Sequence, residues 1–362
     1  MDVTPDLLTF ADGTPVDNEG WPRRRLELAE AIVPHEYGGM PPSGVETIVL
    51  RRSNVAGVKS WPGVRYFTYE VRTRFEEGQE FSLTLSLWVP PGDGPFPVVL
   101  DGDGCWRYFD DHVIQKVLAR GCIAASFDRT EASADNPDNY RDTGLYRLFP
   151  DAEFGSLATW AWGFHRCVDA LEQIDEARAD QIAITGHSRG GKTVILAGAT
   201  DERIAIVNPN DSGIGGAGLN HWKGAGSEQV DSFFGSRNIF WFGKAFADLR
   251  HRDAELPYDQ HFLHALVAPR KLLLTEAYED PGANPPGTYL AAQAARPVFD
   301  LLGVPDAIGW AIREGGHSHH QSDYEALLDF VDVHFHAKQI RRDFQRPLFP
   351  HLAELVARTT SN

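Results

Sequence analysis

The 362-residue sequence predicts an α/β fold with a mostly parallel central sheet, helices on both sides of it and an N-terminal arm. Three observations support this prediction. Strand-like runs at residues 96–100 and 122–127 flank a helix-like segment at 110–120, which is βαβ organisation. An apolar run at 181–185 passes through a glycine-rich turn into a helical segment. Further strand-like runs follow at 204–207, 271–275 and 308–312.

The first part of the chain has a different pattern. Residues 1–45 are rich in proline, glycine and charge, and their amphipathic stretch at 23–32 predicts a helix that wraps the core. Residues 81–89 alternate apolar and polar side chains, which predicts an antiparallel strand before the parallel part. We predict an N-terminal arm at 1–45, one domain at 46–345 and a C-terminal tail at 346–362.

Composition narrows the class of protein. A chain with 42% hydrophobic and 11% aromatic residues can bury a sizeable core. Its net charge of -17 gives no general attraction to phosphate backbones, so nucleic-acid binding is not expected. Three cysteines, Cys105, Cys122 and Cys167, are too few for a disulfide framework, and we expect buried thiols.

The sequence also bears on the cellular compartment. No apolar run approaches the roughly 18 residues of a membrane span. The first residues lack the basic and apolar regions of a signal peptide. The sequence as written therefore predicts a cytoplasmic protein, or a secreted or periplasmic one whose signal peptide has been removed. The oligomeric state stays open.

Residues 186–190 read GHSRG, a G-x-S-x-G pattern directly after the strand-like run at 181–185. This placement predicts a nucleophile elbow, in which a sharp strand-to-helix turn exposes the serine hydroxyl. Glycines are needed on both sides because a side chain there would clash with the adjoining strand or helix. Ser188 is therefore the candidate nucleophile, and the alternative is a glycine-rich turn without a catalytic role.

A nucleophilic serine needs a base and an acid, and in α/β-hydrolases these follow it in the order acid, then histidine. His317 lies on a Gly-Gly loop after the last strand-like run and before a helix predicted to begin near Gln321. It is the candidate general base. This chain order predicts the α/β-hydrolase three-layer sandwich, with residues 46–345 as its catalytic domain.

The identity of the acid is left open between two aspartates. Asp280 follows the strand-like run at 271–275, where most α/β-hydrolases keep the acid, and Asp211 follows the run at 204–207. Glu279 beside Asp280 is a third candidate, and each of the three could equally be a solvated loop carboxylate. We favour Asp280 and keep Asp211.

Two further patterns suggest ligands but lack the right context. His319 and His320 could bind a metal, yet no Cys or His pair with recognised zinc spacing stands nearby, so we expect loop or cap positions and no metal. Residues 213–218, GIGGAG, match a dinucleotide fingerprint, with Asp231 near the distance expected for a ribose-binding acid. Residues 208–212, including Pro209, separate that motif from its strand, so we expect close backbone packing instead of a nucleotide site.

Several strings in the chain resemble the glucuronoyl esterases, carbohydrate esterase family fifteen, and especially their bacterial branch. The resemblance runs nearly end to end and is most specific at the elbow and in the loops that follow it. The strings are LTFADG at 8–13, FGSLATWAWG at 154–163, GHSRGGK at 186–192, NDSGIGGA at 210–217, LPYDQH at 256–261 and ALVAPR at 265–270.

The resemblance implies cleavage, without a cofactor, of the ester between a glucuronic acid branch of xylan and a lignin alcohol. By this resemblance, Arg189 supports the oxyanion with its side chain and its backbone amide. Lys192 looks like the family lysine that holds the sugar hydroxyls, the alternative being a lysine on the helix surface. Gln229 is similar to a sugar-binding glutamine. The expected ligand is a small-molecule or oligosaccharide ester.

The chain also departs from the family pattern. Asp211 stands where the family often carries a glutamate, and Gly282 stands where a sugar-stacking tryptophan follows the acid loop. Trp241 or Trp222 could stack on the sugar from another loop, or could be a core or rim aromatic. A broader carboxylesterase or acetyl esterase for a small carbohydrate or secondary metabolite is therefore the second hypothesis. A non-catalytic carbohydrate-binding protein is the third, although no triad member is missing.

Overall fold

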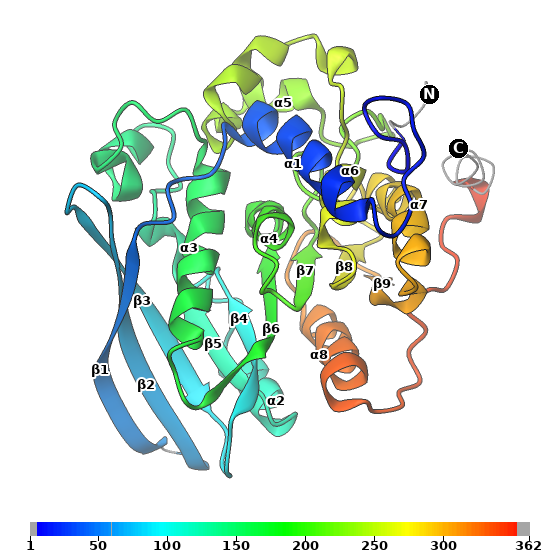
Figure 1. Ribbon diagram of the computed structural model, residues 1–362. Coiled ribbons are helices and arrows are strands. Elements are labelled where there is room, and N and C mark those ends of the chain that lie inside the picture. Colours follow the sequence, from blue (N-terminus) through cyan, green and yellow to red (C-terminus); the bar gives the residue numbers. More distant parts are fainter. Residues whose placement is uncertain (1–5, 59, 353–362) are drawn as a thin grey trace.

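A nine-stranded sheet runs through the computed structural model, which describes residues 6–58 and 60–352 (Figure 1). Its strand order is β1-β2-β3-β5-β4-β6-β7-β8-β9. The pairs β1–β2, β2–β3 and β3–β5 are antiparallel, and all the others are parallel, which confirms the predicted sheet. The strands are β1 (Glu46–Val58), β2 (Trp61–Arg74), β3 (Glu80–Val89), β4 (Phe96–Asp101), β5 (Ile123–Phe127), β6 (Ala177–His187), β7 (Ile206–Asn210), β8 (Lys271–Ala277) and β9 (Ile308–Arg313).

Helices cover both faces of the sheet. In β4, Val98 and Leu100 face the larger apolar core, which includes α3, α4, α6 and α7, whereas Val99 faces the smaller core with α2 and α8. Strands that are covered on both faces consist of consecutive apolar residues, and this is why the sequence shows them as continuous apolar runs. The result is the three-layer α/β-hydrolase sandwich. The helices are α1 (Trp21–Tyr37), α2 (Asp111–Ala119), α3 (Ser156–Leu171), α4 (Arg189–Thr200), α5 (Val230–Gly235), α6 (His261–Val267), α7 (Pro285–Leu301) and α8 (Gln321–His336).

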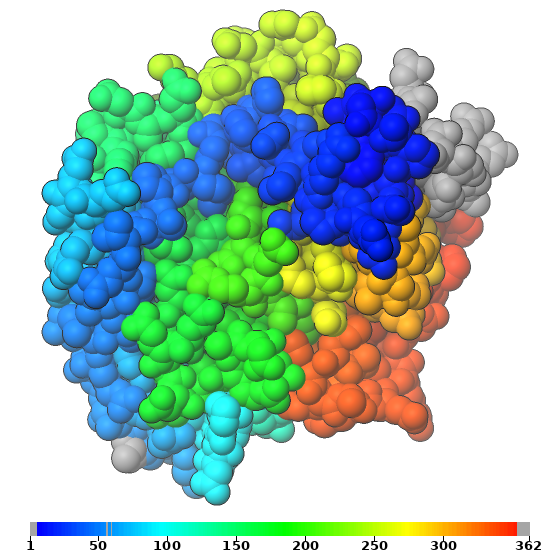
Figure 2. All heavy atoms as spheres, viewed as in Figure 1, coloured from blue at the N-terminus to red at the C-terminus, as the bar shows by residue number. Residues whose placement is uncertain are grey.

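Helix α1 is the main element of the N-terminal arm. Its residues Leu28, Ile32 and Tyr37 are buried in the larger core, and the helix packs on α6. In Figure 2 the dark-blue arm lies against the yellow segments on this face of the molecule. The helix extends beyond the predicted stretch 23–32 and ends at Tyr37. Gly38 follows it with a φ of 74°, a left-handed conformation that glycine adopts without strain.

Strand β7 corrects one prediction. It spans Ile206–Asn210 instead of 204–207, so Pro209 lies inside a central strand although proline cannot donate to the ladder. The side-chain amides of Asn208 and Asn210 supply bonds toward β8, donating to the carbonyls of Leu273 (2.9 Å) and Thr275 (3.2 Å). The glycine-rich motif at 213–218 therefore begins closer to its strand than we expected.

The end of the described chain packs on the sheet. The indole of Trp310 in β9 donates to the carbonyl of Arg346 at 2.8 Å, and Leu348 and Leu352 are buried. Residues 353–362 of the predicted tail lie outside the described residues, and the division of the chain at 45 and 345 stays a prediction. Among the described residues, no helix combines the length and the apolar character that crossing a bilayer requires.

Candidate active site

Ser188 lies at the turn between β6 and α4, at the centre of the parallel strands. Its φ of 56° and ψ of -121° are the strained backbone of a nucleophile elbow. A Cβ at Gly186 would lie 2.9 Å from the backbone of Gly190, and one at Gly190 would lie 2.3 Å from the Asp103 carboxylate. These contacts are the physical reason for both glycines of the motif.

His317 lies beside the serine, on the loop between β9 and α8. Its Nε2 is 3.0 Å from Ser188 Oγ, and its Nδ1 is 2.5 Å from Asp280 Oδ2. The histidine side chain is 47% exposed, whereas that of Asp280 is 8% exposed. The hydrogen bond to Asp280 raises the pKa of His317 above its usual value. Together the three side chains have the geometry of a serine–histidine–acid triad.

Asp211, the other candidate acid, makes different contacts. One carboxylate oxygen accepts the Ala277 amide at 2.7 Å, and the other accepts Arg313 Nη2 at 3.2 Å. Burial, followed by the negative charges of Asp323 and Asp280, raises the pKa of Asp211 to about 7.

The other acids near this loop do not bond to the histidine ring. Glu279, the third candidate, is exposed, and its backbone amide donates to the Gly315 carbonyl in the histidine loop at 3.1 Å. Glu276 is buried beside Asp211, and burial raises its pKa well above the usual value. Asp280 is therefore the acid that the structure brings into direct contact with His317.

The two histidines after His317 have structural positions. His320 caps α8 by accepting the Ser322 amide, and His319 is buried with its ring 3.9 Å from that of Tyr324. Polar atoms of Asp211, Asp280 and His317 do lie within 4.8 Å of one another, a spacing that a metal could use. Both ring nitrogens of His317 already have partners in the protein, however.

Arg189 opens α4 directly after the nucleophile, so its backbone N–H is one of the four that a helix leaves without an internal acceptor. Its guanidinium donates to Asp135 Oδ1 at 3.1 Å and stacks on Trp241 with Cζ 4.5 Å from the ring centroid. The Nε–H of Arg189 is buried and has no hydrogen-bond partner among the described residues. Leaving a buried donor unpaired costs about 1–3 kcal/mol.

Lys192 is buried, with 4% of its side chain exposed, so it is not a lysine on the helix surface. Its amine donates to the carbonyls of Ser212 (2.6 Å) and Ile214 (2.7 Å) and lies 3.2 Å from Glu228. Lys192 therefore holds the loop that carries the glycine-rich motif at 213–218, and this is why the loop packs closely beside the nucleophile helix α4.

The residues predicted to contact the sugar differ in their surroundings. Trp241 is 3% exposed and Arg189 covers one of its faces, so it offers no open platform for a sugar. Of the two roles left open for Trp241, this burial favours a core aromatic over sugar stacking. Gln229 caps α5, and its amide donates to Ser227 Oγ at 2.9 Å. Trp222 lines a pocket of about 280 Å³ that also contains Pro281 of the acid loop.

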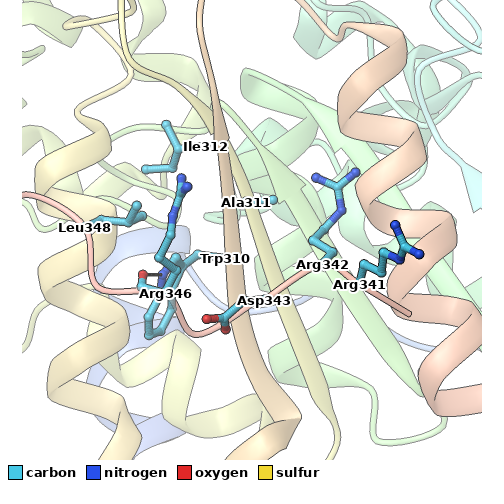
Figure 3. Close-up of a pocket in the computed structure, with 8 residues that line it drawn as sticks. All are labelled: Trp310, Ala311, Ile312, Arg341, Arg342, Asp343, Arg346 and Leu348. Carbon is cyan, nitrogen blue, oxygen red and sulfur yellow. Dashed lines mark hydrogen bonds between the residues drawn. The ribbon is translucent and has the colours of Figure 1, made fainter. Parts of the chain in front are cut away.

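A further pocket of about 350 Å³ runs along the edge strand β9 (Figure 3). Residues of β9 form one side, and the segment after α8, with three arginines, forms the other. The triad residues are not among those that line it, which are Trp310, Ala311, Ile312, Arg341, Arg342, Asp343, Arg346 and Leu348.

Sequence reasoning missed several residues of the site. Asp103, Arg129 and Asp135 follow β4 and β5. Asp103 accepts the backbone N–H of His187, Asp135 accepts the Arg189 side chain, and Arg129 binds both carboxylates. Their position after strand ends is the signal that could have found them. Arg313 at the end of β9 binds both Asp211 and Asp323. These contacts could not be predicted without the fold.

The fold and the elbow serine define the class of protein, which is the α/β-hydrolases that cleave carboxylic esters with a serine. Residues 73–303 match the sequence profile of the family described as fungal glucuronyl esterase. A 4-O-methyl-glucuronoyl methylesterase from Wolfiporia cocos is 30% identical over 334 residues, which cover 88% of this chain and 76% of that protein. The chain belongs to the glucuronoyl esterase family and is a serine carboxylic ester hydrolase.

Solved structures agree with this assignment. A glucuronoyl esterase of carbohydrate esterase family 15 from Caldicellulosiruptor kristjansonii aligns with a TM-score of 0.84 and 32% identity, covering 96% of this chain and 94% of that one. An esterase of the same family from a marine bacterial metagenome, described as promiscuous, aligns with a TM-score of 0.78 and 26% identity, covering 92% and 97%.

Proposed function

We propose that this protein hydrolyses esters that join glucuronic acid, or its 4-O-methyl form, to an alcohol. The observation that carries the proposal is the hydrogen-bonded series Ser188, His317 and Asp280 in a chain of this family. The substrate class rests on similarity to relatives named for 4-O-methyl-glucuronoyl esters.

In the proposed mechanism, His317 Nε2 takes the proton from Ser188 Oγ as that oxygen attacks the ester carbonyl. The carbonyl oxygen becomes an oxyanion, and the Arg189 side chain and backbone amide stabilise its charge. His317 then gives its proton to the departing alcohol. A water molecule, deprotonated by the same histidine, releases the glucuronic acid from Ser188.

We assign the triad acid to Asp280. Its carboxylate accepts Nδ1–H of His317, which holds the ring orientation and stabilises the imidazolium formed during attack. Asp211 has a raised pKa and binds Arg313, so we assign it an electrostatic role behind the triad.

We propose that the sugar lies beside the loop that Lys192 holds at residues 212–214, on the side of Glu228. Gln229 follows Glu228 directly, so it remains our candidate for a sugar contact. Trp222, which lines the pocket on the acid loop, replaces Trp241 as our candidate stacking residue. Glycine at position 282 leaves this side of the site more open than a tryptophan would.

Two observations favour broader ester hydrolysis as the second candidate. The marine relative is described as promiscuous, and position 282 here lacks a large side chain that could select the sugar. Turnover of short acyl esters without preference for a uronate would support this alternative.

The test compares kcat/KM for benzyl glucuronate and para-nitrophenyl acetate on one preparation, with Ser188→Ala as the control. Loss of the nucleophile should lower kcat by a factor on the order of 10⁶ while the protein stays folded. A strong preference for the glucuronate supports the proposal. Acetate turnover without glucuronate turnover would keep the serine mechanism and reject the substrate.

A further inference from the structure

Two arginines and three tryptophans form an alternating stack beside the nucleophile. The Arg129 guanidinium carbon lies 4.3 Å from the ring centroid of Trp160 and 4.7 Å from that of Trp106. The Arg189 carbon lies 5.4 Å from Trp106 and 4.5 Å from Trp241. Each cation therefore lies between two aromatic rings, and Trp106 is shared by both.

A series of hydrogen bonds joins the same arginines to both neighbours of Ser188. Asp103 accepts the backbone N–H of His187 at 2.7 Å and Arg129 Nε at 2.8 Å. Arg129 donates twice to Asp135 Oδ2, with both bonds at 3.2 Å. Asp135 Oδ1 accepts Arg189 Nη1 at 3.1 Å. The series thus begins at the residue before the nucleophile and ends at the residue after it.

Burial makes this arrangement rigid at one end and accessible at the other. The side chains of Arg129 and Asp103 are 0% exposed, that of Asp135 is 12% exposed, and that of Arg189 is 32% exposed. Buried charges must keep their partners, so Arg129 fixes the position of the Asp135 carboxylate. The carboxylate of Asp135 is therefore held in place, and it orients the more exposed side chain of Arg189.

We propose that Asp135 is a positioning residue for the ester hydrolysis, which holds the Arg189 guanidinium where the oxyanion forms. The Trp106 and Trp241 rings restrict where the guanidinium can move, and the hydrogen bond to Asp135 fixes how it is rotated. The inference rests on the proposed role of Arg189 at the oxyanion. It assigns a function in turnover to a carboxylate that does not touch the substrate.

The first test is a double-mutant cycle with Asp135→Asn and Arg189→Ala. Loss of one oxyanion donor lowers kcat by about 10²- to 10³-fold, and we expect this of Arg189→Ala. Misplacing the same group should make Asp135→Asn at least about tenfold slower in kcat, with little change in KM. The double variant should be no slower than Arg189→Ala alone, because both changes remove one function.

Asp138→Asn is the matched control, because Asp138 lies three positions further on in an exposed ion pair with Arg237. It should retain wild-type kcat. Additive losses in the double variant, or unchanged kcat in Asp135→Asn, would overturn this inference alone. Unchanged kcat in Arg189→Ala would overturn the oxyanion role in the proposed function, and this inference with it.

A second measurement does not require Asp135→Asn to fold. Arg189→Ala leaves a space between Trp106 and Trp241 with the Asp135 carboxylate at its edge, so free guanidinium ion at millimolar concentration should restore part of kcat. Ammonium ion, which has the same charge but no planar face, should not. Equal rescue by the two ions, or rescue by neither, would contradict the positioning geometry.

Discussion

The two sides of Ser188 are built in different ways. On one side, β7, β8 and β9 contribute Asp211, Asp280 and His317, which are carboxyl and imidazole groups around a half-exposed ring. On the other side, segments after β4 and β5 contribute the fully buried pair Asp103 and Arg129, and Arg129 binds the mostly buried Asp135 that contacts Arg189. Proton transfer requires a ring that can gain and lose charge beside water, whereas a forming oxyanion requires a fixed cation.

The largest difference in kcat should appear when each of the two acids on the proton-transfer side is replaced in turn by asparagine. Asp280→Asn removes the acceptor of His317 Nδ1 and should lower kcat by about 10⁴-fold. Asp211→Asn, which has no direct bond to the ring, should cost far less. Steady-state kcat for both variants measures the difference.

Glu279→Gln is the control for that comparison, because Glu279 adjoins Asp280 but is exposed. It should behave as wild type. If Asp211→Asn were the slower of the two variants, the assignment of the acid would have to be reversed.

The pH dependence should separate the two sides next. His317 must be neutral to act as a base, and its pKa lies above the usual value, so kcat/KM should fall about tenfold per pH unit below that pKa. Asp280 is the largest cause of the raised pKa, and Asp211 contributes less. Of the two substitutions, Asp280→Asn should therefore move the midpoint further toward lower pH.

Asp135→Asn gives the contrast, because it acts on the oxyanion side and should leave the midpoint where it is. Rate profiles between pH 5 and 9 on stable protein test both expectations. A midpoint that moved equally in Asp280→Asn and Asp135→Asn would mean that the two sides are not separate.

The smallest effect concerns Lys192, which lies between the nucleophile helix and the loop at 212–214. Lys192→Met leaves two buried carbonyls without their donor and should lower the free energy of unfolding by about 2 kcal/mol. It should also raise KM more for a glucuronate ester than for an acetate. Thermal unfolding and KM for both esters measure this, with exposed Lys244→Met as the control. Equal changes in KM would argue against a sugar contact.

The rule that catalytic groups follow strand ends explains what could be predicted from the sequence. Applied to the last three strands, it selected Asp211, Asp280 and His317, which the fold brings within reach of one another. Asp103 and Asp135 also follow strand ends, those of β4 and β5, yet the sequence alone did not identify them. Neither aspartate belongs to a recognisable sequence motif, and the residues next to Ser188 that they contact lie far away in the chain.

Other features depend on packing that no local pattern encodes. Pro209 ends a strand by its local preference, yet β7 continues through it, and the side-chain amides of Asn208 and Asn210 add hydrogen bonds to β8. By residue type, Lys192 is expected at the surface and Trp241 as a stacking platform. Both are buried because loops fold over them. The sequence favours Asp280 over Asp211 only by its place after the penultimate strand-like run, and the hydrogen bond from His317 to Asp280 distinguishes the two directly.

The N-terminal arm has a consequence for how this chain is made. Glu36 in α1 is fully buried, and its partners include the amide of Gln260 at 2.7 Å, 224 residues further along the chain. At a synthesis rate of about 5–20 residues per second, α1 leaves the ribosome roughly 10 to 45 seconds before that partner exists. During this interval the apolar face of the helix has no native surface to cover it. Chaperones that bind nascent chains should therefore act first on this arm.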